Sequence, residues 1–211
     1  GTTKFRSLAL FPSEVLKRAP TKHDSCLDHV SQMVIQAGAD FELVAEELEE
    51  SKQNIVLDFD WKSLMSGNNY KIGVFPKSKV LCLVFDYSTS ITSFVKSSSI
   101  LISHGGTGTV LESLSILVSS KKQPRIVLVS NSSLLHNHQL DFVNELDKSG
   151  VIVAASSDDF KDILDAIKKA RDLDIDSLIN KTINLFPSLQ NLTNSTIMQP
   201  FSAILQEELS K

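Results

Sequence analysis

Hydrophobic residues gather into short runs, and these runs alternate with segments in which apolar residues recur every three or four positions. Six runs have strand length and are nearly continuous, namely Ser7–Phe11, Met33–Gln36, Val80–Phe85, Ile100–Ser103, Arg125–Ser130 and Val151–Ala154. Near-continuous apolar strands are typical of parallel sheets whose two faces are both covered. We therefore expect most of these strands to be buried.

The segments between the runs place their apolar residues on one face at helical spacing. Strand–helix alternation predicts an α/β fold with a mostly parallel sheet. Ser157-Asp158-Asp159 is a predicted cap for the fourth helix, and the polar stretch Lys52–Ser78 is predicted to be a loop-rich insertion. The predicted helices cover Phe41–Glu50, Thr109–Leu117, Asn137–Lys148 and Asp158–Arg171, followed by a pair near Ile175–Leu185 and Met198–Leu209.

Composition narrows the class of protein only slightly. The 211 residues are 42% hydrophobic and 22% charged, as in ordinary globular proteins, and their formal net charge is −4. That charge disfavours a nucleic-acid binder that relies on bulk positive potential. No run reaches the roughly 18 apolar residues that a membrane span needs, and the first residues lack a signal-peptide pattern. Cys26 and Cys82 have no metal-ligand spacing, and Cys82 is predicted to be a buried thiol.

The most informative motif is the glycine-rich stretch Ser103–Thr109, Ser-His-Gly-Gly-Thr-Gly-Thr, between a predicted strand and a predicted helix. Gly105, Gly106 and Gly108 allow a tight turn and close approach of a ligand to the backbone. Thr107 and Thr109 add hydroxyl groups, and the helix N-terminus attracts an anion. The motif lacks the Lys-Ser/Thr of an NTPase loop and the third glycine of a dinucleotide fingerprint. It therefore indicates a diphosphate site of another kind, or a plain strand-to-helix turn.

Three neighbouring features have two interpretations each. Glu112 is either the capping-box acid of a helix that starts at Thr109 or an acceptor for a ribose diol. His104 is either a general base or a donor to a phosphate oxygen. Asn137-His138-Gln139 opens a predicted helix, either as solvated capping residues or as groups that recognise sugar hydroxyls and an acetamido group. A zinc site is disfavoured because no third ligand has suitable spacing.

Together these motifs resemble a known family. Ile102–Thr109 with Glu112-Ser113-Leu114, followed by Asn137-His138-Gln139, resembles the donor-binding subunits of eukaryotic dolichol-pathway N-acetylglucosaminyltransferases. These are similar in turn to the C-terminal half of the bacterial lipid-linked GlcNAc transferase of peptidoglycan synthesis. Met33–Gly38 and Phe85–Ser88 extend the resemblance, which covers roughly residues 7–155.

The resemblance implies a fold and a site. The fold would be the Rossmann-like donor half of a GT-B glycosyltransferase over residues 1–174, with a C-terminal helical appendage over 175–211 that could dock a partner. Phe85 and Asp86 would border the uracil of UDP-GlcNAc, Gly106–Thr109 would hold the diphosphate, and Glu112 the ribose. Gly105 is a further predicted substrate-binding residue. Asn137, His138 and Gln139 would contact the GlcNAc, and His104 is the candidate catalytic residue. No metal or other cofactor is expected.

The resemblance also implies a reaction and a partner. The family adds the second GlcNAc in a β-1,4 linkage to GlcNAc-diphospho-dolichol, with inversion, on the cytosolic face of the endoplasmic reticulum. A membrane-anchored, acceptor-binding subunit recruits the donor-binding chain from the cytoplasm. One departure is that Leu8-Ala9-Leu10 runs directly into Phe11, without the family's glycine-rich loop after its first strand. The alternative function is a non-catalytic nucleotide-sugar-binding or scaffolding module.

Overall fold

The structure is a computed structural model that describes residues 6–17, 30–53, 55–76, 80–121, 124–129 and 137–193. Within these ranges, it does not describe the side chains of residues 6–7, 15–17, 137–140 and 191–193. The chain divides into two compact units, Gly1–Phe94 with Asp158–Leu164, and Val95–Ser157 with Asp165–Lys211. Helix α4 (Thr92–Ser97) and helix α7 (Phe160–Arg171) cross the boundaries between the units.

Unit 1 is built on a four-stranded mixed sheet in the order β1-β4-β3-β2. Strands β1 and β4 are parallel, whereas β3 is antiparallel to both β4 and β2. All five residues of β4 are buried, as its continuous apolar sequence predicts. The elements are α1 (Arg6–Lys17), β1 (Gln32–Gln36), the 3-10 turn η2 (Gly38–Asp40), α2 (Phe41–Glu46), β2 (Glu49–Glu50), α3 (Trp61–Leu64), β3 (Tyr70–Val74) and β4 (Leu81–Phe85).

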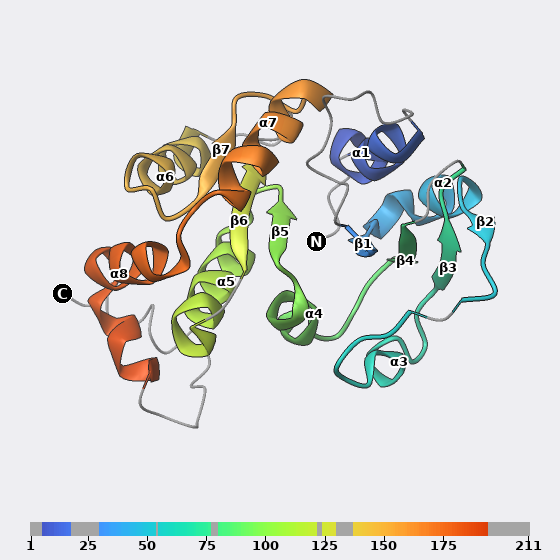
Figure 1. Cartoon of the computed structure of the whole chain (residues 1–211), viewed down its shortest axis with the longest axis horizontal. Helices are drawn as coiled ribbons and strands as arrows, with labels where there is room; N and C mark the ends of the chain where they lie inside the picture. Colours follow the sequence, from blue (N-terminus) through green and yellow to red (C-terminus); the bar gives the residue numbers. More distant parts are fainter. Residues whose placement is uncertain are drawn as a thin grey trace. The chain divides into compact units, whose positions relative to one another are not determined.

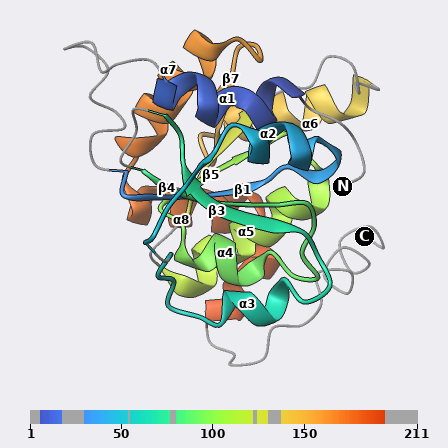
Figure 2. The same cartoon turned by 90° about the vertical axis from the view of Figure 1, so that its right-hand side faces the viewer.

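Two hydrophobic clusters cover the two faces of this sheet. One face packs Ile35, Cys82 and Val84 against residues of α1 and α2, and the other packs Leu83 and Phe85 against α3 and its flanking loops. Figure 2 shows α1 and α2 on one side of these strands and α3 on the other. Cys82 is fully buried, as predicted, and burial raises the pKa of its thiol to about 12.

Unit 2 contains a three-stranded, all-parallel sheet in the order β5-β6-β7. Its core joins Val110 and Leu114 of α5 to strand β6, to α6 and to Leu178 of α8. Figure 1 shows α5 and α8 side by side in this unit. The elements are β5 (Ile100–Ser103), α5 (Thr107–Ser120), β6 (Arg125–Val129), α6 (Asn137–Lys148), β7 (Val153–Ala155), α8 (Ile175–Leu185) and the 3-10 segment η3 (Pro187–Thr193).

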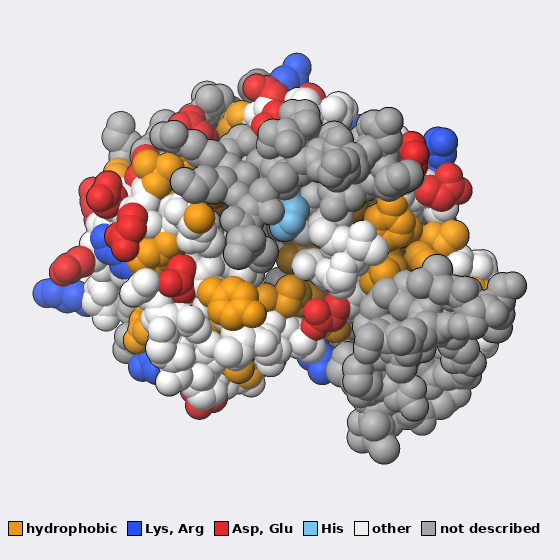
Figure 3. Space-filling model, turned by 180° about the vertical axis from the view of Figure 1, so that it is seen from behind, with side chains coloured by type: hydrophobic (Ala, Val, Ile, Leu, Met, Phe, Trp, Pro, Cys, Tyr) orange, Lys and Arg blue, Asp and Glu red, His pale blue; other side chains and the backbone are white. Residues whose placement is uncertain are grey.

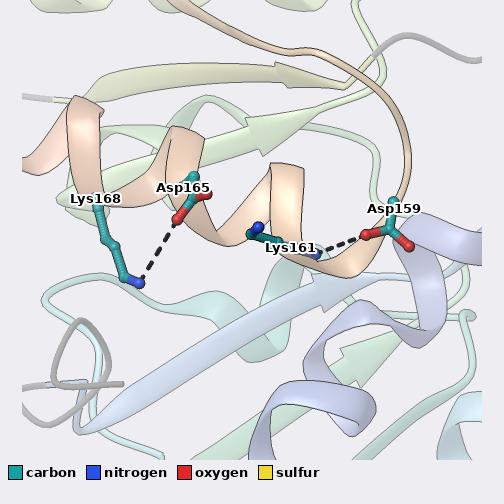
Figure 4. A network of polar contacts seen from close by, with 4 residues as sticks. All are labelled: Asp159, Lys161, Asp165 and Lys168. Atoms are coloured by element: carbon teal, nitrogen blue, oxygen red, sulfur yellow. Dashed lines mark hydrogen bonds and ion pairs between the residues drawn. The ribbon is translucent and has the colours of Figure 1, made fainter. Parts of the chain in front are cut away.

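Helix α7 begins where its sequence predicts. The Asp159 carboxylate accepts a hydrogen bond from the Lys161 N–H at 3.1 Å, and the Asp159 carbonyl accepts one from Ile163. Further along the same helix, Lys168 lies 3.7 Å from Asp165 (Figure 4). Because both side chains of this ion pair are substantially exposed, it contributes little to stability. The cap at Asp159 therefore fixes the start of α7.

Three sequence predictions differ from the structure in unit 1. The predicted helix Phe41–Glu50 ends at Glu46, and Glu49–Glu50 form strand β2. Ser7–Phe11 forms part of helix α1 and not a strand. A five-residue apolar run fits either element, and here Ala9, Leu10 and Phe11 pack as a helix against the sheet and Phe160. The departure from the family's pattern therefore remains, because a helix without glycine lies where the first strand and its glycine-rich loop were expected. The predicted loop-rich insertion Lys52–Ser78 contains helix α3 and strand β3, and β3 pairs with β2 and β4.

The C-terminal helices have different outcomes. Helix α8 spans Ile175–Leu185, as predicted, and contributes Leu178 and Ile179 to the core of unit 2. The predicted helix Met198–Leu209 lies outside the described residues. The division into a domain over 1–174 and an appendage over 175–211 stays a prediction, and its boundary falls between α7 and α8, inside unit 2.

Candidate functional site

The turn between β5 and α5 depends on glycine at Gly105. Its φ of +81° lies in the left-handed region, which side chains other than glycine rarely adopt. A Cβ atom placed on Gly105 would also lie 3.2 Å from Cγ2 of Val143. The Gly105 N–H donates to Oγ of the buried Ser103 at 3.4 Å. The turn is therefore built so that the chain reverses tightly before α5 begins.

The N-terminus of α5 has backbone N–H groups that lie outside the hydrogen bonds of the helix itself. Gly106 is its N-cap, with no side-chain cap, and the Val110 N–H donates to the Gly106 carbonyl at 3.1 Å. The N–H groups of Thr107, Gly108 and Thr109 precede that bond, so they have no carbonyl partner within the helix. Thr107 and Gly108 are exposed. These donors and the helix dipole together make a site for an anion.

Open space surrounds Gly108. A Cβ atom placed there would have no neighbour within 4 Å, although the residue is helical and has an ordinary φ. Fold stability therefore does not require glycine at this position. A glycine that packing does not require lets a ligand approach the backbone closely.

Glu112 lies one turn further into α5. The helix begins at Thr107, so Thr109 lies inside its first turn and is not the N-cap. The capping-box interpretation of Glu112 is therefore wrong. Side chains at i and i+4 share a helix face, and a helical side chain leans toward the N-terminus. This places the half-buried Glu112 side chain over Gly108, on the face where the open backbone lies.

His104 precedes the glycines and is half-buried. Burial lowers the pKa of its imidazole below the ordinary value of 6.5, so the ring is neutral at pH 7. Its Nε2 lies 3.4 Å from the position of a Cβ atom on Gly106. A neutral imidazole has one N–H donor and one acceptor nitrogen. His104 therefore brings one further donor beside the N-cap of α5.

The loop after β4 belongs to unit 1 and is held by its own hydrogen bonds. The Phe85 ring is 2% exposed and stacks on Phe94, with centroids 5.3 Å apart. Oδ2 of Asp86 accepts hydrogen bonds from the backbone N–H and from Nδ2 of Asn69, at 3.3 and 3.0 Å, and its Oδ1 accepts one from the Tyr87 N–H. Asp86 thus fixes the loop, and Tyr87 follows with 55% of its surface exposed.

The model of the glycosyltransferase family 28 C-terminal domain matches residues 1–174. This chain belongs to that family. The expected fold class, an α/β Rossmann-like donor half of a GT-B glycosyltransferase, is thereby confirmed. The predicted parallel arrangement holds for the sheet of unit 2, where both strand pairs are parallel, whereas the sheet of unit 1 is mixed, with one parallel and two antiparallel pairs.

Curated relatives of this family 28 domain carry the name UDP-N-acetylglucosamine transferase subunit ALG13. The Candida albicans protein is 28% identical over 142 residues, which are 66% of this chain and 45% of that protein. The Debaryomyces hansenii protein is 27% identical over 63% of this chain and 65% of its own length. The human protein is 34% identical over 67 residues, 32% of this chain and 5% of that protein. The chain thus spans about half the length of the fungal relatives. A solution NMR structure of ALG13 is 17% identical, with a TM-score of 0.45 over 73% of this chain and 81% of that one.

The sugar-binding residues of the family 28 domain remain a prediction. Helix α6 begins at Asn137, as predicted, but the side chains of Asn137, His138 and Gln139 lie outside the described residues. The structure brings His104, Gly105–Thr109 and Glu112 together in unit 2, and it places Phe85 and Asp86 in unit 1. Tyr87 was not among the predicted site residues. Its place two residues after the buried strand β4 could have indicated it, because ligands bind beyond the carboxyl ends of strands in α/β sheets.

On the face shown in Figure 3, acidic and basic side chains lie scattered among neutral and hydrophobic ones. Among the described residues, no group of three or more His, Cys, Asp or Glu side chains is placed to hold a metal ion. No helix in the described part of the chain is long and apolar enough to cross a membrane.

Proposed function

We propose that this chain is the UDP-GlcNAc-binding, catalytic subunit of an inverting N-acetylglucosaminyltransferase. Its reaction is the addition of the second GlcNAc, in a β-1,4 linkage, to GlcNAc-diphospho-dolichol in N-glycan precursor synthesis. The observation that carries this proposal is the N-terminus of α5, where the N–H groups of its first turn, the open backbone of Gly108 and the Glu112 carboxylate share one helix end. The names of the relatives support UDP-GlcNAc as the donor.

The geometry gives each group a role toward the donor. The N–H groups of Thr107, Gly108 and Thr109 bind the diphosphate, and Glu112 accepts hydrogen bonds from the ribose hydroxyls. His104, kept neutral by burial, donates its N–H to a phosphate oxygen. Phe85 and Asp86 hold the loop that borders the uracil, and Tyr87 offers its ring for stacking. Asn137, His138 and Gln139 bind the GlcNAc.

Catalysis follows from charge that develops on the leaving group. The 4-hydroxyl of the acceptor sugar attacks C1 of the donor GlcNAc and gives its proton to a general base on the acceptor side, while the bond from C1 to the phosphate oxygen breaks and its electrons stay on UDP. UDP leaves with an additional negative charge. Fixed N–H donors at a helix N-terminus stabilise that charge more in the transition state than in the ground state. This arrangement supplies the stabilisation without a metal ion.

The proposed subunit works with a membrane-anchored partner that binds the acceptor, at the cytosolic face of the endoplasmic reticulum. The word "subunit" in the names of the relatives supports a partner. The segment Met198–Leu209, a predicted apolar helix, is the candidate docking element. Helix α8 is a poorer candidate because Leu178 and Ile179 are buried in unit 2.

Two measurements test the proposal. UDP-GlcNAc is first titrated into the chain by calorimetry, with GDP-mannose as the control nucleotide sugar. Transfer of radiolabelled GlcNAc to a GlcNAc-diphospho-lipid is then assayed with and without the membrane partner. Saturable UDP-GlcNAc binding together with transfer by the reconstituted pair is expected. Binding without transfer by that pair would favour the non-catalytic module, and no binding would refute both.

A further inference from the structure

The glycines of the turn before α5 have different surroundings. A Cβ atom placed on Gly108 would meet nothing within 4 Å, and one placed on Gly106 would meet the ring of His104, a side chain of the turn itself. A Cβ atom on Gly105 would lie 3.2 Å from Cγ2 of Val143, which belongs to helix α6. Carbon atoms in ordinary contact are about 3.5–4.0 Å apart. The missing side chain of Gly105 therefore lets α6 approach the turn closely.

Val143 is the part of α6 that makes this approach. It is 4% exposed and shares a hydrophobic cluster with Val110 and Leu114 of α5. A β-branched side chain in a helix has one strongly preferred rotamer, and closely packed side chains cannot shift freely. Val143 thus acts as a rigid spacer between α6 and the turn. Both helices and the turn lie in unit 2.

The other end of α6 has its own attachment. Oδ1 of Asp147 accepts a hydrogen bond from the Ala154 N–H of β7 at 2.8 Å, and the Val151 N–H donates to the Leu146 carbonyl at 3.3 Å. These bonds hold the C-terminal turn of the helix. Among residues 141–148, the part of α6 whose side chains are described, Val143 is the buried residue nearest the N-terminus. The placement of the first turns of α6 therefore depends on its packing.

We propose that Val143 is a positioning residue for the sugar of the donor, because its contact with Gly105 fixes the first turns of α6 relative to the diphosphate turn. This inference rests on the proposed function, in which Asn137, His138 and Gln139 bind the GlcNAc. Gln139 lies four residues before Val143, which is about 6 Å along the helix axis. A shift of α6 at Val143 carries to these residues, while the N–H groups of α5 stay in place.

Val143→Ala tests this role because it removes two methyl groups and leaves a gap that α6 closes only in part. Affinities for UDP and UDP-GlcNAc are measured by calorimetry with the membrane partner present, and kcat is measured for transfer by the pair. The affinity for UDP stays unchanged. The ratio of the UDP-GlcNAc affinity to the UDP affinity falls by about 3- to 10-fold, as for one misplaced hydrogen bond. The kcat falls by about 10- to 100-fold, because a misplaced sugar reacts more slowly.

Two further variants separate position from stability. Val143→Thr keeps the branched shape but buries a hydroxyl group, so it should lower the Tm and retain both the affinity ratio and kcat. Val151→Ala is the matched control, because it removes the same two methyl groups from the same hydrophobic cluster, beyond the C-terminal end of α6. It should lower the Tm about as much as Val143→Ala and leave the affinity ratio and kcat unchanged.

Two results would overturn the assignment. An unchanged affinity ratio and kcat in Val143→Ala means that the contact with Gly105 does not place the sugar. Losses in Val143→Thr or Val151→Ala that follow the fall in Tm mean that Val143 only stabilises unit 2. Failure of the unaltered chain to bind UDP-GlcNAc would instead refute the proposed function, so the two failures are distinguishable.

Discussion

Replacement of Gly108 by alanine should separate the stability of helix α5 from the binding of an anion at its N-terminus. Gly108 lies in the first turn of α5, is exposed, and has open space where a Cβ atom would stand. Alanine at this position meets no atom of the protein. Any loss of ligand affinity must then come from contact between the new methyl group and the ligand.

The two effects have opposite signs. Glycine within a helix is less favourable than alanine by roughly 0.5–1 kcal/mol. Gly108→Ala should therefore stabilise the fold and raise the Tm by about 1–4 °C for a chain of this length. A diphosphate that hydrogen-bonds to the N–H groups of Thr107–Thr109 would collide with the added methyl group. We expect at least a tenfold weaker affinity for UDP, which corresponds to about 1.4 kcal/mol.

Lys121→Gly is a matched control at the other end of the same helix. Lys121 is the C-cap of α5 and has a φ of +56°, a left-handed conformation that costs a residue with a side chain about 1 kcal/mol. Glycine there should raise the Tm to a similar degree. Because Lys121 lies at the far end of α5, its replacement should leave the affinity for UDP unchanged.

Thermal unfolding and calorimetric titration with UDP are measured for all three proteins. A Gly108→Ala variant that is more stable and binds UDP as tightly as the unaltered chain would refute our reasoning, because the ligand would then approach from another direction. A variant that is less stable would show that the space at Gly108 is filled in solution.

Four further changes test other parts of the site. Gly105→Ala should lower the free energy of unfolding by about 1–2 kcal/mol in denaturant titrations, because it forces a left-handed conformation and crowds Val143. Glu112→Gln should weaken UDP by roughly 10- to 100-fold in calorimetry but leave pyrophosphate, which has no ribose, unaffected. Burial lowers the pKa of His104 in the folded chain, so the unfolded chain binds more protons at this residue below about pH 7. The free energy of unfolding should therefore fall as the pH drops from 7 through 6.5 and below. His104→Gln should flatten that pH dependence. Tyr87→Ala should weaken UDP about tenfold while Tyr87→Phe retains it, since stacking on a base contributes roughly 1–3 kcal/mol.

The elements that the sequence predicted well have strong local signals. Strand β5 spans Ile100–Ser103, and helices α6 and α8 have the predicted bounds, because each has a clear apolar period and a recognisable end. The glycine-rich motif was also recognisable, since Gly105 needs a left-handed φ that few other residues adopt. At these places the local sequence favours one backbone conformation over the others.

Only tertiary structure decided the elements whose local signal was weak. The apolar run Ser7–Phe11 has the length of a strand, but it is helical because its side chains pack on one face of the sheet. Strand β3 was missed because it lies in a stretch that is polar on average, although Tyr70, Ile72 and Val74 alternate as in a strand, and its pairing with β4 shows that it is one.

The roles of single carboxylates also depended on contacts that a sequence does not contain. The start of α5 at Thr107 removed the capping role of Glu112, and the bonds from Asn69 and Tyr87 gave Asp86 a structural one. Asp40 belongs to an acidic segment that is typical of a solvated helix face, yet the fold buries one of its oxygens without a donor. The sequence by itself determined which residues could bind a nucleotide sugar. The fold decided where these residues lie and what they contact, because helix starts and side-chain hydrogen bonds depend on packing between segments that are far apart in the chain.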